Sequence, residues 1–177
     1  MQQPGFDLES IRDARALLAD AILTTPVHEL AGPGLGAAFA PGTRPVLKLE
    51  LFQRTGSFKP RGALLNVLAL SPEERARGIC AVSGGNHAIA TAYAARRLGC
   101  PAHIVMPASA NPFRAAQCRA WGAEVELVPT VHDALPRADE LSRARGLSLI
   151  HPFEGLRTAL GTATLGLEFM EQVPDLD

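Results

Sequence analysis

Apolar positions follow different periods in different parts of the chain. In residues 8–23 they recur at helical spacing, which predicts an amphipathic helix that ends before Thr25-Pro26. Residues 45–51 (PVLKLEL) alternate apolar and polar side chains and predict a half-buried strand. The segment QRTGSFKPRGA is expected to turn into a second helix, with Pro60 in its first turn. The apolar set of the first helix is Ile11, Ala14, Leu17, Leu18 and Ile22.

From residue 78 onward, short apolar strands alternate with helical stretches. The segments GICAVSGG, PAHIVMP, AEVELVP and LSLIHP have the character of strands. Between them lie predicted helices that end at Gly99 and Gly122, and a third that contains Pro136 as a candidate kink. Strands alternating with helices of about 10–15 residues predict βαβ units, a parallel sheet and helices on both of its faces. The segment GLRTALGTATLGLEFMEQV predicts a last helix.

Composition narrows the class of protein without identifying it. The chain has 177 residues, a net charge of −1 and three cysteines. A charge near zero provides no field for nucleic acid or anionic lipid, and no apolar run approaches the ~20 residues of a membrane span. The start of the chain lacks the pattern of a secretory signal. We therefore expect a cytoplasmic protein with reduced, buried thiols, no disulfide framework and no metal site.

The chain has 17 lysine and arginine residues, of which only Lys48 and Lys59 are lysine. A guanidinium stays protonated and cannot form a Schiff base, so each lysine is a candidate reactive amine. Lys59 is predicted at a junction between a strand and a helix, beside Phe58. An apolar setting lowers the pKa of a lysine and supplies the neutral amine that Schiff-base chemistry requires. The alternative is that Lys48 and Lys59 are ordinary surface lysines.

The segment Ser83-Gly84-Gly85-Asn86-His87 lies where a predicted strand passes into a helix. Small residues let the backbone approach a ligand, and the free N–H groups of a helix start attract an anion. The alternative is a tight turn in which Asn86 caps the helix. The segment lacks the dinucleotide fingerprint G-x-G-x-x-G, the G-K-[ST] of a P-loop and the G-x-S-x-G of a nucleophile elbow.

Taken together, these segments resemble the fold-type II pyridoxal-phosphate enzymes, in the branch of threonine dehydratase, serine dehydratase and serine racemase. The segments TGSFKPRGA, SGGNHAIATAYAA, PAHIVMP, WGAEVELV and HPFEG occur in the order and spacing of that family, and TTPVHEL and VLKLELFQ fit its opening. The resemblance covers the chain from about residue 8 to residue 177. It implies pyridoxal 5′-phosphate as the cofactor.

The resemblance assigns roles to individual residues. Lys59 matches the lysine that binds the cofactor as a Schiff base and later moves the α-proton. Phe58 matches the residue packed beside the pyridine ring, and Asn86 the residue that hydrogen-bonds the cofactor's 3′-oxygen. Lys48 has no catalytic match, and we expect it to be structural. The loop that closes on the substrate carboxylate would be Ser83, Gly84, Gly85, Asn86 and His87.

The implied reaction is dehydration and deamination of L-threonine or L-serine to a 2-oxo acid and ammonia, in a homodimer. Serine racemase, hydroxyaspartate dehydratase and an inactive truncated fragment are the alternatives. Racemising relatives carry a serine hydroxyl at the position of Gly84, so the glycine favours elimination.

The resemblance also implies an architecture like that of the tryptophan synthase β-subunit, with two α/β domains. Residues 70–151 would form the small domain, and residues 1–69 and 152–177 would be parts of the large one. The family binds the cofactor phosphate with a Gly-rich loop and the pyridine nitrogen with a serine or cysteine beyond this segment. No GGGG run occurs here. We therefore expect the 177-residue chain alone to bind the cofactor weakly and to be inactive.

Overall fold

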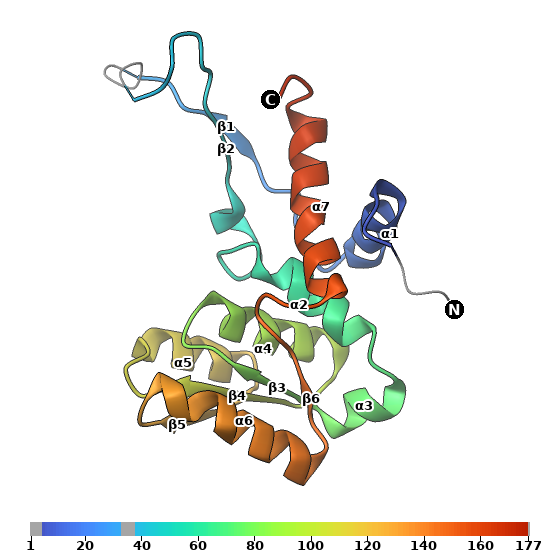
Figure 1. Ribbon diagram of the computed structural model, residues 1–177, viewed down its shortest axis with the longest axis vertical. Coiled ribbons are helices and arrows are strands. Elements are labelled where there is room, and N and C mark those ends of the chain that lie inside the picture. Colours follow the sequence, from blue (N-terminus) through green and yellow to red (C-terminus); the bar gives the residue numbers. More distant parts are fainter. Residues whose placement is uncertain (1–4, 33–37, 177) are drawn as a thin grey trace.

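The computed structural model describes residues 5–32 and 38–176 (Figure 1). The strands are β1 (Val27–Glu29), β2 (Val46–Lys48), β3 (Ile79–Val82), β4 (Ala102–Pro107), β5 (Glu124–Val128) and β6 (Ser148–Leu149). The helices are α1 (Leu8–Leu18), the short 3₁₀ helix η2 (Glu50–Phe52), α2 (Lys59–Leu68), α3 (Pro72–Arg77), α4 (Asn86–Leu98), α5 (Pro112–Ala120), α6 (Val131–Arg145) and α7 (Leu156–Gln172).

A four-stranded sheet with the order β5-β4-β3-β6 forms one half of the molecule, and all its neighbouring strands are parallel. Helices α4 and α5 pack on one face of this sheet, and α6 packs on the other (Figure 1). The predicted parallel α/β architecture is thus confirmed. Ligands bind such open sheets at the carboxyl ends of the strands, so the segments after β3 and β6 are the ones to examine.

The sequence explains why this sheet has two covered faces. Strands β3 and β4 are nearly continuous apolar runs, as expected for strands buried on both sides. Ile79 and Ile104 pack toward the Ala-rich helix α4, whereas Cys80 and Val105 pack toward α6. Helices α4 and α6 end at Gly99 and at Gly146, whose φ angles of 65° and 66° lie in the left-handed region that glycine favours.

The other half of the molecule contains α1, α2, α7 and the antiparallel pair β1–β2 (Figure 1). Helix α2 lies between α4 and α7 and so joins the two halves. One apolar cluster runs from Leu18 through Leu64 to Ile79, without a break between the halves. The sheet falls within the expected small domain, residues 70–151, but the division into domains stays a prediction.

Several boundaries differ from the expected ones. The first helix ends at Leu18, and residues 19–22 continue as turns that still bury Ala21 and Ile22. Of the expected strand 45–51, only Val46–Lys48 forms a strand, because the short helix η2 begins at Glu50. Helix α3 was not predicted, although Ser71 and Glu74 form the capping box that marks a helix start. Helix α6 continues through Pro136.

The three cysteines are buried and unbonded, as the sequence led us to expect. Burial raises the pKa of Cys80 and of Cys118 to about 11, so these thiols stay protonated near neutral pH. Within the described ranges, no helix is both long and apolar enough to span a membrane.

Candidate functional site

Lys59 is the first residue of α2. The chain reaches it through a turn at Gly56, whose φ of 71° favours glycine, and buried Pro60 follows it in the first helical turn. The side chain is half-buried, and its Nζ donates a hydrogen bond of 2.9 Å to the carbonyl oxygen of Pro152. Burial lowers the pKa of the Lys59 amine. In this position the Lys59 amine is easier to deprotonate than that of an exposed lysine.

A pocket of about 450 Å³ opens beside this amine. Its walls include Phe58, Pro152 and Phe153, together with Thr158 and Thr162 of α7. The Lys59 Nζ lies 4.2 Å from the centroid of the Phe153 ring and 5.2 Å from that of the Phe58 ring. Phe153 is 75% exposed, so an aromatic face is available to a bound molecule. The pocket thus combines one amine with flat apolar surfaces.

The segment Ser83–His87 follows β3 at the carboxyl end of the sheet. The Ser83 hydroxyl accepts a hydrogen bond of 3.0 Å from the Gly85 N–H. Gly85 is the N-cap of α4 and Asn86 its first residue, so the alternative in which Asn86 caps the helix is wrong. The start of α4 therefore presents free N–H groups, as an anion-binding segment requires.

His87 links this segment to Lys59. Its Nε2 lies 2.9 Å from the carbonyl oxygen of Ile150, and because a carbonyl only accepts, Nε2 carries the proton. Burial, chiefly, lowers the pKa of His87 to about 4, and the charge of Lys59 contributes. Ile150 is two residues before Pro152, which accepts from Lys59. Residues 150–153 thus join two motifs that are well separated in the sequence.

Asn86 has a partner that sequence reasoning missed. The Nη1 of Arg114, on α5, donates to the Oδ1 of Asn86. Arginine has donors only, so the amide oxygen is the atom that faces it, and the Nδ2 group stays available to donate elsewhere. Pro152 and Phe153 belong to the HPFEG motif, which the sequence analysis used only for the family resemblance. No local sequence signal marks Arg114, Pro152 or Phe153 as a neighbour of the site, because their contacts depend on the fold.

Lys48 contributes to a different cluster. Its side chain is 4% exposed and pairs with Glu168 of α7. The expected structural role of Lys48 agrees with this position.

These groups fit the cofactor that the resemblance implies. A half-buried primary amine suits an aldehyde, aromatic side chains suit a pyridine ring, and the Nδ2 group of Asn86 suits a phenolic oxygen. The hydroxyls of Thr55 and Ser57, in the loop before Lys59, are buried without a partner among the described residues. Buried polar atoms of this kind are often satisfied by a ligand or water.

Comparison with known proteins gives a consistent result. The family described as "Pyridoxal-phosphate dependent enzyme" matches residues 18–177. A phenylserine dehydratase of Ralstonia pickettii is 46% identical over 97% of this chain and 51% of its own length. An L-threonine ammonia-lyase of Thermotoga maritima is 43% identical over 74% of this chain and 33% of its own length.

Among solved structures, a serine racemase of maize superposes with a TM-score of 0.85 at 34% identity, over 97% of this chain and 51% of that protein. The chain thus spans about half the length of the phenylserine dehydratase and of the maize protein.

Proposed function

Because the chain belongs to the family of pyridoxal-phosphate dependent enzymes, we propose that the whole protein dehydrates and deaminates a 3-hydroxy amino acid, such as L-threonine or L-serine. The products would be a 2-oxo acid and ammonia. Ammonia-lyases and dehydratases among the relatives support this class of reaction. A homodimeric assembly and a cytoplasmic location remain predictions.

The observation that carries the proposal is the Lys59 amine. It is half-buried, its pKa is lowered, and it lies beside an apolar pocket at the start of a helix. The only other lysine, Lys48, is ion-paired and 4% exposed. Of the two side-chain amines, Lys59 is therefore the one suited to bind an aldehyde and to accept a proton.

The other residues take supporting roles in this proposal. The bound cofactor supplies an electron sink for the substrate's α-carbon. Lys59 would remove the α-proton, and the loop of residues 83–87 would hold the substrate carboxylate, chiefly through the free N–H groups at the start of α4. The Asn86 Nδ2 would hold the cofactor's 3′-oxygen. Phe58 and Phe153 exclude water from the ring. His87, neutral above a pKa of about 4, holds the segment that contains Pro152.

Serine racemisation is the second candidate, and the likeness to a serine racemase favours it. The position of Gly84 argues for elimination instead. A Cβ added to Gly84 would lie 3.0 Å from the Cβ of Ala110, so a serine fits there only if residue 110 moves. A proton-transfer group must come within ~3 Å of the proton. With Gly84 in place, the loop offers no side chain at this position.

The first prediction concerns the reaction itself. The whole protein, supplied with pyridoxal 5′-phosphate, is expected to release 2-oxo acid and ammonia from L-threonine or L-serine. 3-Phenylserine belongs in the same panel, because the pocket beside Lys59 is flanked by Phe58 and Phe153. Oxo-acid formation and chiral analysis of the residual amino acid are followed together. Accumulation of D-serine as fast as pyruvate would contradict the proposed elimination.

The second prediction concerns Gly84. A Gly84→Ser/Ala110→Gly double variant, which adds the hydroxyl and removes the crowding methyl group, is expected to gain D-serine formation. Gly84→Ala/Ala110→Gly is the matched control, because it adds the same Cβ in the same background without a hydroxyl. Chiral chromatography of the products measures the gain. Equal D-serine formation in both variants would mean that the hydroxyl has no role.

A further inference from the structure

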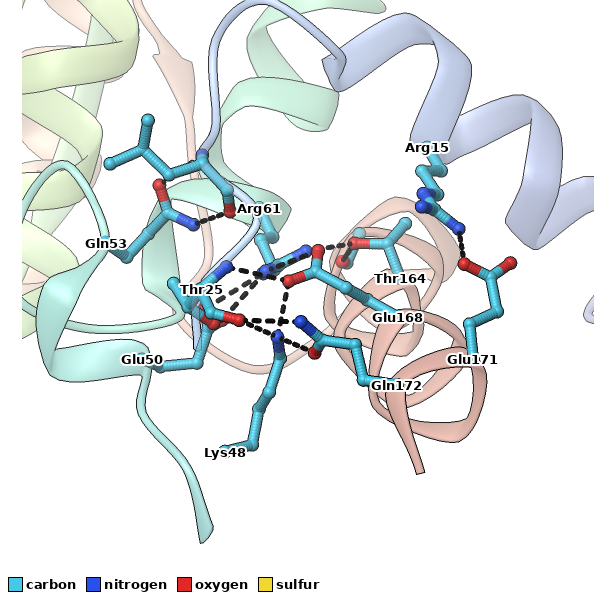
Figure 2. Close-up of polar contacts among 12 residues, drawn as sticks. Arg15, Thr25, Lys48, Glu50, Gln53, Arg61, Thr164, Glu168, Glu171 and Gln172 are labelled. Carbon is cyan, nitrogen blue, oxygen red and sulfur yellow. Dashed lines mark hydrogen bonds and ion pairs between the residues drawn. The ribbon is translucent and has the colours of Figure 1, made fainter. Parts of the chain in front are cut away.

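Arg61, two residues after Lys59, is a fully buried guanidinium. Its side chain is 0% exposed and contacts two carboxylates (Figure 2). Glu50 of η2 accepts two hydrogen bonds, of 2.9 Å from Nε and 2.8 Å from Nη2. Glu168 of α7 accepts a third, of 3.0 Å, from Nη2. This bidentate geometry fixes the direction of the guanidinium as well as its distance.

The network around Arg61 is balanced in charge. Lys48 pairs with Glu168 and also donates a hydrogen bond of 2.6 Å to the carbonyl oxygen of Thr25 (Figure 2). Two cations and two carboxylates therefore share one buried site. Although burial alone lowers the pKa of Arg61, its two carboxylate partners outweigh this effect and raise it. The network connects the strand β2, the helix η2 and the helix α7 to the first turn of α2.

A close approach of α2 and α7 acts on the same turn. A Cβ added to Gly161 would lie 2.5 Å from the Arg61 carbonyl oxygen and 2.7 Å from the Gly62 Cα. A Cβ added to Gly62 would lie 3.3 Å from the Thr158 carbonyl oxygen. The two backbones therefore touch where α2 begins. This contact is independent of the charged side chains.

We propose that Arg61 and Gly161 are positioning residues for the Lys59 amine. Stability alone is a weak reason for such a network, because apolar residues of similar volume often replace a buried ion pair at little cost. The network and the glycine contact instead fix the turn from which the Lys59 side chain extends to Pro152. The importance of that position rests on the proposed function of Lys59, whereas the position itself can be measured without cofactor.

The measurement relies on the chain having only two lysine amines and one N-terminal amine. The 177-residue chain is acylated briefly over a range of pH, and mass spectrometry compares the modification of Lys59 with that of the N-terminal amine. The rate reports the neutral fraction and the exposure of Lys59. The ionisable neighbours in this region are His87 on α4 and His151 before Pro152.

Gly161→Ala is the first test, with Gly166→Ala on the same helix as its control. A Cβ at Gly166 meets nothing within 4 Å, so the control adds a methyl group without contact. Gly161→Ala is expected to displace the first turn of α2 and to move the Lys59 profile toward that of a free lysine. A shift of one pKa unit lowers the neutral fraction about tenfold. Profiles that coincide for the two folded variants would overturn the proposal.

Arg61→Met/Glu50→Gln is the second test, and it decides the question if Gly161→Ala does not fold. It removes one charge of each sign and leaves the Lys48–Glu168 pair intact. We expect a folded chain, judged by circular dichroism, with a shifted Lys59 profile. Arg15→Met, which removes an exposed ion pair with Glu171, is the control (Figure 2). An unshifted profile, or loss of folding in both test variants, would assign these residues to stability alone.

The acylation profile separates this proposal from the proposed function. A protein that fails to turn over hydroxy amino acids can still show the shift, and then only the function is refuted. A protein that turns them over without showing the shift refutes only the positioning role.

Discussion

Replacing Lys59 with arginine is expected to abolish covalent capture of pyridoxal 5′-phosphate. Turnover by the whole protein should fall at least about a thousandfold, the scale on which loss of a covalent catalytic residue acts. The cause is chemical, because the guanidinium keeps its positive charge but stays protonated and forms no Schiff base. In the wild-type protein, borohydride reduction should instead attach the cofactor to Lys59 through a stable secondary amine. Peptide mass spectrometry identifies the modified residue.

Two controls test whether the labelling is specific to Lys59. Lys48, at 4% side-chain exposure, serves as an internal control that should stay unmodified. Arg54→Lys introduces an exposed amine five residues before Lys59, and its low modification would show that labelling follows the site rather than exposure. Labelling confined to Lys48 or to the N-terminus would remove Lys59 from its proposed role.

Removing Arg61 alone is expected to have the largest effect on stability. Arg61→Met leaves Glu50 and Glu168 buried with Lys48 as their remaining cation, and breaking a buried pair in this way costs about 3–5 kcal/mol. For a chain of this size, the expected fall in melting temperature is roughly 10 °C. Thermal and urea unfolding followed by circular dichroism measure the change.

The matched comparison again uses the exposed pair. Arg15 and Glu171 are 36% and 50% exposed in their side chains, so Arg15→Met should cost no more than about 1 kcal/mol. Adding Glu50→Gln to Arg61→Met should recover much of the lost stability, because it removes the unpaired carboxylate. Equal costs for Arg15→Met and Arg61→Met would mean that burial does not govern the network.

The buried ion-pair network around Arg61 should also make the free energy of unfolding depend on pH. Burial raises the pKa of Glu168, but its contacts with Lys48, Arg61 and Thr25 lower the pKa by more than burial raises it. The pKa of Glu168 is therefore below its ordinary value. A carboxyl group whose pKa is depressed in the folded state stabilises the fold at any pH above its pKa in the unfolded state. This stabilisation is lost as the pH falls through the pKa of the folded state. Acid should therefore weaken the contact between α2 and α7.

Much of the fold was predictable because its signals are local. The parallel sheet could be inferred from four short apolar runs alternating with helices, and Gly99 ends a helix where its sequence suggested. The errors lie where a local pattern has two structural solutions. The apolar residues Ala21 and Ile22 fit a longer helix, but turns bury them equally well. Strand β1 is three residues long, too short for a period of two to be recognised.

The sequence by itself determined which residue types were available for the chemistry. Schiff-base formation needs a primary amine, and Lys48 and Lys59 are the only lysines, so the sequence offered two candidate side chains. The motif around Lys59 favoured that residue. The order of the motifs also indicated the family. Both inferences need only side-chain identity and neighbours close in the chain. The family is confirmed, and the role of Lys59 stays a prediction.

Only the tertiary structure decided how these groups meet. Arg61 and Glu168 are 107 residues apart, and Lys59 and Pro152 are 93 apart, yet each pair is hydrogen-bonded. The contact of Arg114 with Asn86 likewise depends on how α5 packs beside α4. No periodicity encodes such pairs, because they result from how whole helices pack. Lys59 was thus a candidate from the sequence alone, whereas the contact of its amine with Pro152 is known only from the tertiary structure.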